Sequence, residues 1–180
     1  IIDVELDTLS NVVMGKEIIK YTNNSPDKLD FLWLHLDQNL FIKESRGNAL
    51  IPLEGSRNGT KGQFFDAGFK ISAVQLITGK GRNKKISDAK YIINDTRMRV
   101  DLPESLEAKG GSVSLKIDFS FISPNYGSDR MGILETKNGK IYSVAQWYPR
   151  MCVYDDVKGW DNLPYLGQGE FYLEYGDFNI

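Results

Sequence analysis

The sequence predicts an all-β fold, either an antiparallel β-sandwich or a saddle-shaped β-sheet domain, from three observations. Apolar and polar residues alternate in several runs, most clearly Ile2-Val4-Leu6 and residues 113–121. Glycine, proline and asparagine clusters interrupt these runs about every ten residues. No long segment keeps a clean helical period. Since alternation gives each strand one wet face and one buried face, we expect layered sheets.

Each strand is predicted from its own run of apolar, β-branched or aromatic residues, bounded by turn residues. Asn138–Gly139 lies between two such runs and predicts a hairpin with a type I′ turn. Residues 37–50 are expected to hold one short helix or turn, and 55–62 and 79–85 to be loops. We expect at least eight strands and less than about 10% helix. The predicted strands are 2–6, 15–22, 30–37, 69–77, 90–93, 97–102, 113–121, 131–136, 140–147, 150–155 and 170–175.

The composition is that of an ordinary globular protein, with 41% hydrophobic and 26% charged residues among 180. That length suits one domain, so we expect a single β-domain over 1–180. A net charge of −2 gives no electrostatic footprint for nucleic acid. No apolar run reaches the roughly 18–20 residues of a membrane span. We therefore expect this segment neither to bind nucleic acid nor to span a membrane.

Little catalytic chemistry is available to the chain. With one histidine, His35, and one cysteine, it lacks the side chains of a catalytic zinc site, so no metal or cofactor is expected in this chain. Asp155 and Asp156 are adjacent and point to opposite faces of an extended strand, so they do not converge on a glycosidic bond. We interpret His35 as facing a sheet surface and Trp33 as core. No catalytic residue is assigned.

Aromatic residues gather in the stretch 144–178, VAQWYPRMCVYDDVKGWDNLPYLGQGEFYLEYGDF. It holds two of the three tryptophans, Trp147 and Trp160, with five of the nine tyrosines and the cysteine. Large aromatic residues are typical of surfaces that another domain covers. They also form platforms that stack on sugars. One hypothesis is therefore a free-standing carbohydrate-binding or adhesive β-sandwich, with Trp147 and Trp160 coplanar and exposed.

A longer pattern in this stretch favours a different hypothesis. Gln146-Trp147-Tyr148-Pro149-Arg150, followed by Tyr154-Asp155-Asp156, resembles the end of the N-terminal β-domain in the aminopeptidase N family of zinc metallopeptidases. That family includes the leukotriene hydrolases, and the sequence of this stretch is most similar to that of its bacterial branch. Segments 15–41 and 96–124 resemble the same domain, whereas 42–95 match it weakly.

The resemblance implies a non-catalytic N-terminal domain of a zinc aminopeptidase, ending before the catalytic domain. The zinc and its ligands would then belong to that following domain, which would be the partner of this one. This domain would contact a peptide substrate only as part of the parent enzyme. The resemblance suggests a periplasmic or extracellular location and leaves a cytoplasmic one open.

The resemblance also implies roles for individual residues. In the family, a glutamine of this domain helps to bind the free α-amine of the substrate, and its counterpart here is Gln146. The family places that residue five or seven positions before the arginine, whereas here the spacing is four. The alternative is a glutamine at a strand end that bonds to backbone. The expected domain-interface residues are Trp147, Tyr148, Arg150, Tyr154, Asp155, Asp156 and Trp160.

Overall fold

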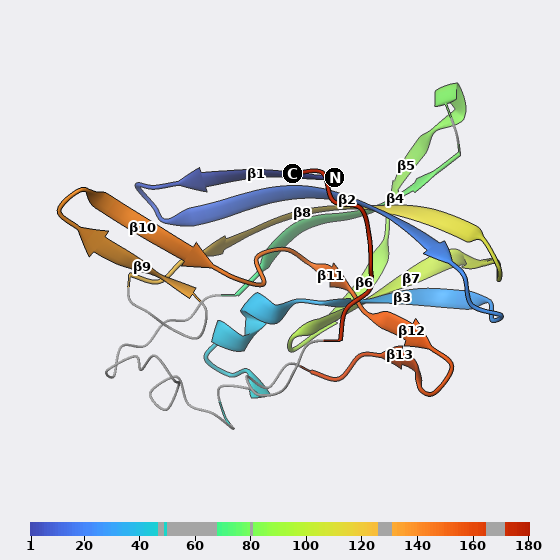
Figure 1. Cartoon of the computed structure of the whole chain (residues 1–180). Coiled ribbons are helices and arrows are strands. Elements are labelled where there is room, and N and C mark those ends of the chain that lie inside the picture. Colours follow the sequence, from blue (N-terminus) through green and yellow to red (C-terminus); the bar gives the residue numbers. More distant parts are fainter. Residues whose placement is uncertain (47–48, 50–67, 80, 126–130, 165–171) are drawn as a thin grey trace.

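The computed structural model describes residues 1–46, 49, 68–79, 81–125, 131–164 and 172–180 and is almost entirely β (Figure 1). Strands make up 58% and helices 6%, and no helix reaches seven residues in these ranges. The all-β prediction is therefore confirmed. The same ranges contain no helix that is both long and apolar enough to cross a membrane.

Two antiparallel sheets form the body of the fold. The five-stranded sheet has the order β1-β2-β8-β4-β5 and the four-stranded sheet the order β11-β3-β7-β6. The hairpins β9–β10 and β12–β13 are attached to them. The five-stranded sheet comprises β1 (Ile2–Asp7), β2 (Val12–Asn23), β8 (Gly111–Ile122), β4 (Lys70–Thr78) and β5 (Lys85–Asp88). The four-stranded sheet comprises β11 (Arg150–Met151), β3 (Leu29–His35), β7 (Arg97–Leu106) and β6 (Lys90–Asn94). The remaining elements are β9 (Met131–Thr136), β10 (Gly139–Val144), β12 (Val153–Asp155), β13 (Gly159–Asp161) and the 3₁₀ turns η1 (Asp37–Phe41) and η3 (Gly81–Asn83).

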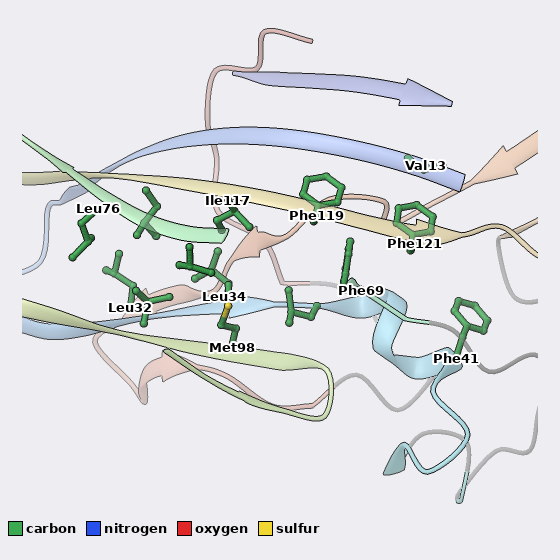
Figure 2. Packing of buried hydrophobic residues seen from close by; sticks show 14 of the residues in the cluster. Val13, Leu32, Leu34, Phe41, Phe69, Leu76, Met98, Ile117, Phe119 and Phe121 are labelled. Atoms are coloured by element: carbon green, nitrogen blue, oxygen red, sulfur yellow. The ribbon is translucent and has the colours of Figure 1, made fainter. Parts of the chain in front are cut away.

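The hydrophobic core lies between the two sheets, as in a β-sandwich (Figure 2). The inward row of β8 faces the inward rows of β3 and β7, because every second side chain of each strand points to the same layer. Phe69 closes one end of the core, with its ring centroid 5.5 Å from those of Phe119 and Phe121 in edge-to-face contacts. The alternation seen in 113–121 therefore marks the central strand of the core.

Gly15 of β2 lies directly against the ring of Phe119 in the core. A Cβ atom added there would lie 2.2 Å from Cζ of Phe119. We expect Gly15→Ala to lower the free energy of unfolding by about 1–3 kcal/mol, because a tightly packed core resists added volume. Urea denaturation measures this, with Gly176→Ala as the control, since a Cβ atom added there would lie 3.8 Å from Cε2 of Phe178. An unchanged midpoint for Gly15→Ala would contradict the expectation.

The predicted hairpin at Asn138–Gly139 is confirmed, but the expected turn type is wrong. Gly139 already pairs with Thr136, so the loop consists of Lys137 and Asn138. A type I′ turn needs positive φ at both loop residues, whereas here the positive value, 120°, belongs to Gly139. The Thr136 hydroxyl stabilises the turn by accepting from the Asn138 amide at 3.1 Å and donating to the Gly139 carbonyl at 2.8 Å.

Other boundaries also differ from the prediction. The expected strand 150–155 is divided at Cys152, whose amide donates to the Trp33 carbonyl at 2.9 Å, so β11 joins a sheet and β12 a separate hairpin. Residues 172–175 form no strand, while 170–171 and the expected loop 55–62 lie outside the described residues. The expected short helix or turn within 37–50 corresponds to η1. The short strands β5 and β13 were not predicted.

Candidate functional site

The segment between β10 and β11, which carries Gln146, is held against the turn η1. Gln38 of η1 is 2% exposed and its amide nitrogen donates to the carbonyls of Ala145 at 2.8 Å and Gln146 at 3.2 Å. A buried amide that spans two successive carbonyls fixes the path of the chain at that point. The position of Gln146 is therefore set by a side chain more than a hundred residues earlier.

Gln146 has a strained backbone and an uncommitted side chain. Its φ is 49°, in the left-handed region that few residues other than glycine, asparagine and aspartate enter. Such a conformation costs about 1–3 kcal/mol and persists where its surroundings over-determine it. The side chain is half-buried and makes no hydrogen bond within the described residues. The structure thus places Gln146 in a loop. Its backbone carbonyl accepts a hydrogen bond from Gln38, whereas its side chain makes none there.

Arg150 forms a buried ion pair with Asp37, the first residue of η1. Arg150 is 9% exposed and Asp37 3%, and Nε of the arginine donates to Oδ2 of the aspartate at 2.9 Å. A terminal guanidinium nitrogen donates to the same oxygen. Arg150, expected to hold the shape of the loop or a domain contact, is buried in this chain, and its charge is satisfied by a carboxylate of the same chain.

The third residue of η1, Asn39, connects two further segments. Its Oδ1 accepts from the Phe69 amide at 2.8 Å and its Nδ2 donates to the Asp95 carbonyl at 2.8 Å. Asp37, Gln38 and Asn39 are thus three successive buried polar residues, each bonded to a different part of the chain. Sequence reasoning missed this polar cluster. The signal for it was a D-Q-N triplet placed directly between apolar Leu36 and Leu40.

The aromatic residues of the stretch 144–178 divide into two groups. Trp147 contacts Tyr148 at a centroid distance of 5.0 Å, and Tyr148 contacts Phe178 at 5.8 Å. Trp160 lies against Tyr154 at 5.2 Å and Tyr21 at 5.9 Å. Both tryptophans are half-buried and pack against the hydrophobic core of their own fold. They belong to separate groups, so the coplanar, exposed pair of the sugar-binding hypothesis is not found.

The acidic residues near the end of β12 have local structural partners. Tyr154 donates from its hydroxyl to Oδ2 of Asp27 at 2.9 Å. Oδ1 of Asp155 accepts from the amides of Lys158 at 2.8 Å and Val157 at 3.0 Å, which closes the β12–β13 turn. These bonds, with that from Lys158 the largest, lower the pKa of Asp155. Asp156 is exposed and lies in the turn after β12, not on the extended strand that the sequence argument assumed.

Glu17 is a carboxyl group on the inward side of β2, which sequence reasoning did not single out. It is 4% exposed, and its Oε2 has no hydrogen-bond partner among the described residues. Burial raises the pKa of Glu17 to about 8, partly offset by the terminal ammonium of Ile1. The signal for it was the alternation Val13, Gly15, Glu17, Ile19, which places the acid in a row of core positions.

His35 and Trp33 share the outer face of the four-stranded sheet. This agrees with the interpretation of His35, whereas Trp33, expected in the core, is half-buried beneath the Arg97 guanidinium at 5.6 Å. Strand alternation explains the difference, because Leu32 and Leu34 occupy the inward positions. Burial lowers the pKa of His35, mainly through the cost of desolvating its charged form.

Among the described residues, neither the cysteine nor the acidic side chains form a reactive or metal-binding group. Burial raises the pKa of the Cys152 thiol, which leaves it protonated and unreactive. The described part of the chain holds no cluster of three or more His, Cys, Asp or Glu side chains suited to a metal ion. The zinc that the resemblance implies would belong to the following domain, so no step of hydrolysis is assigned to these residues.

Comparisons with known proteins add no relative to this description. No protein-family model matches the chain, and no curated protein matches it. Neither comparison links the chain to the zinc metallopeptidases that its sequence resembles. The class defined by the fold is an all-β protein of two packed antiparallel sheets.

Proposed function

We propose that this chain is the non-catalytic β-domain of a zinc aminopeptidase, which packs on the catalytic domain and supplies Gln146 to the rim of the substrate pocket. The proposal rests on the sequence resemblance over 15–41 and 141–178. The structural observation that supports it is the conformation of Gln146, with a strained backbone and a side-chain amide that makes no hydrogen bond within the described residues.

The physical argument concerns what such an amide is able to bind. Its oxygen accepts a hydrogen bond, and a substrate α-ammonium carries three donors. The bonds from Gln38 hold the backbone of this segment, so the point from which the Gln146 side chain extends is fixed before substrate arrives. Pre-positioning of this kind reduces the ordering cost of binding. In this proposal the zinc and the hydrolytic chemistry belong to the other domain.

The structure changes what the expected interface residues contribute to this proposal. Of those seven residues, Asp156 is exposed, and the others are half-buried or buried. Trp147 and Tyr148, which directly follow Gln146, pack on the core of their own fold. We infer that these aromatic residues support the pocket rim from below, while the ion pair of Arg150 anchors the start of β11.

The Gln146→Ala variant of the whole enzyme tests this proposal. A hydrogen bond to a charged group contributes roughly 1.5–3 kcal/mol, so kcat/KM for aminoacyl-nitroanilides should fall by about 10–150-fold. The thermal midpoint should change little, because alanine keeps the same Cβ atom and the backbone bonds of Gln38 remain. Hydrolysis of acetylated peptides, which lack the ammonium, should not respond.

Two further variants complete the test. Gln146→Gly removes the same amide but relieves the left-handed backbone, so it should lose the same activity without loss of stability. Gln75→Ala changes a half-buried glutamine of β4 whose amide donates to Asp88 at 2.9 Å, and activity should be retained. An unchanged kcat/KM for both Gln146 variants would remove Gln146 from the pocket. A whole protein without bound zinc or peptidase activity would refute the proposal itself.

A further inference from the structure

The strand β6 (Lys90–Asn94) has one edge without a partner strand. It is the last strand of the four-stranded sheet and pairs with β7 on one side, with no strand on the other side in the described ranges. All five of its residues are exposed, and Ile92 retains 65% of its surface. A strand edge of this kind presents a row of backbone donors and acceptors to other chains.

The side chains of β6 do little to protect this edge. Tyr91 and Ile93 pair with Val100 and Met98, which are 0% exposed, yet they themselves are 38% and 40% exposed. The five-stranded sheet therefore does not cover the side chains on the inward face of β6. Native edge strands are usually protected by charged residues, proline or a bulge, but the centre of this strand is Tyr-Ile-Ile. Such a segment favours pairing with another strand.

We propose that two copies of this chain associate through antiparallel pairing of their β6 strands, around a two-fold axis at Ile92. In this register Ile92 lies opposite Ile92, Tyr91 opposite Ile93, and Lys90 opposite Asn94. Apolar side chains then face apolar ones, and aromatic and β-branched pairs of this kind stabilise sheets. Each cation faces a neutral amide, so no like charges oppose each other.

This self-complementarity identifies the occupant as a second copy of the chain. Another outer strand, β1, shows the contrast, because its alternating Asp3, Glu5 and Asp7 would bring acidic groups together in a self-pair. The Ile2 amide of β1 is also already bonded to the Asn179 carbonyl at 2.8 Å. Pairing through β6 uses the same patch on both subunits and closes after two copies.

The expected dimer is reversible, because one pair of five-residue strands buries less surface than a permanent interface. Sedimentation velocity of the full chain over a wide concentration range should show a monomer that converts to a dimer. Ile92→Lys places two like charges opposite each other and should raise the Kd by about tenfold or more. The matched control is Leu134→Lys on β9, where the leucine is 62% exposed, and it should leave the Kd unchanged.

A crosslinking experiment tests the register. Opposite Cβ atoms in an antiparallel pair lie within the range that a disulfide spans with a small adjustment. Oxidation of Ile92→Cys with diamide should therefore give a covalent dimer, and Leu134→Cys should not; the native Cys152 is buried and does not compete. The proposal is overturned by a monomer at every concentration, by equal effects of the two lysine variants, or by a dimer that Ile92→Cys fails to crosslink.

Discussion

Asp37→Asn should lower the free energy of unfolding by about 3–5 kcal/mol, although the substitution hardly changes the size of the side chain. The carboxylate of Asp37 is 3% exposed and accepts two hydrogen bonds from the Arg150 guanidinium. Replacing it by an amide leaves the arginine charge in the same buried place without its opposite charge. The loss therefore comes mainly from the uncompensated cation, and urea denaturation measures it.

The double variant separates the charge effect from packing. Arg150→Met removes the cation and keeps an apolar chain of similar length, so in the Asp37→Asn background it should recover part of the loss. A positive coupling between the two sites is expected, because they act on one interaction. The control is Glu107→Gln at the exposed pair with Lys28, which is 2.8 Å long and where at most about 1 kcal/mol should be lost. Equal effects at both pairs would contradict the argument.

The sequence predicts the sheets well because a local period determines the face of each side chain. Apolar and polar residues alternate strictly from Val113 to Phe121. In the fold, the apolar residues form the inward row of β8 and the polar residues its outward row. In β3 the alternation places Leu32 and Leu34 inward and His35 on the outer face, as interpreted for His35. Trp33 was wrongly expected in the core because of its apolar strand, although its position in the alternation puts it on the outer face.

The candidate site depends on contacts that no local pattern contains. Asp37 and Arg150 are 113 residues apart, and Gln38 meets the carbonyl of Gln146 across 108 residues. A D-Q-N triplet after a strand is typical of a solvated turn. Only the fold shows that these three residues are buried. Aromatic density in 144–178 led to the expectation of a domain interface, but density alone does not tell such an interface from the side of a core, against which Trp147 and Trp160 pack.

Glu17 should make the stability of this protein fall as the pH rises. Its ordinary pKa of 4.5 applies to the unfolded chain, whereas burial raises the folded value to about 8. Between these two values the folded state holds a proton that the unfolded state has released. Unfolding then loses a proton, so stability is full below pH 4.5 and declines by up to about 1.4 kcal/mol per pH unit until about pH 8. The total loss is on the order of 5 kcal/mol.

The Glu17→Gln variant removes this titration, since its amide carries no charge at any of these values. Its unfolding midpoint in urea should be nearly independent of pH from 7 to 9, above the range in which His35, with its lowered pKa, titrates. Above about pH 8 the midpoint should exceed that of the parent protein, because no charge is left to desolvate. At pH 5 the two proteins should be alike, since protonated glutamic acid and glutamine are both neutral. Glu5→Gln, on the exposed strand beside it, should follow the parent at every pH. A parent protein whose stability does not change between pH 5 and 8 would show that the Glu17 carboxyl finds a donor or reaches water in the folded state.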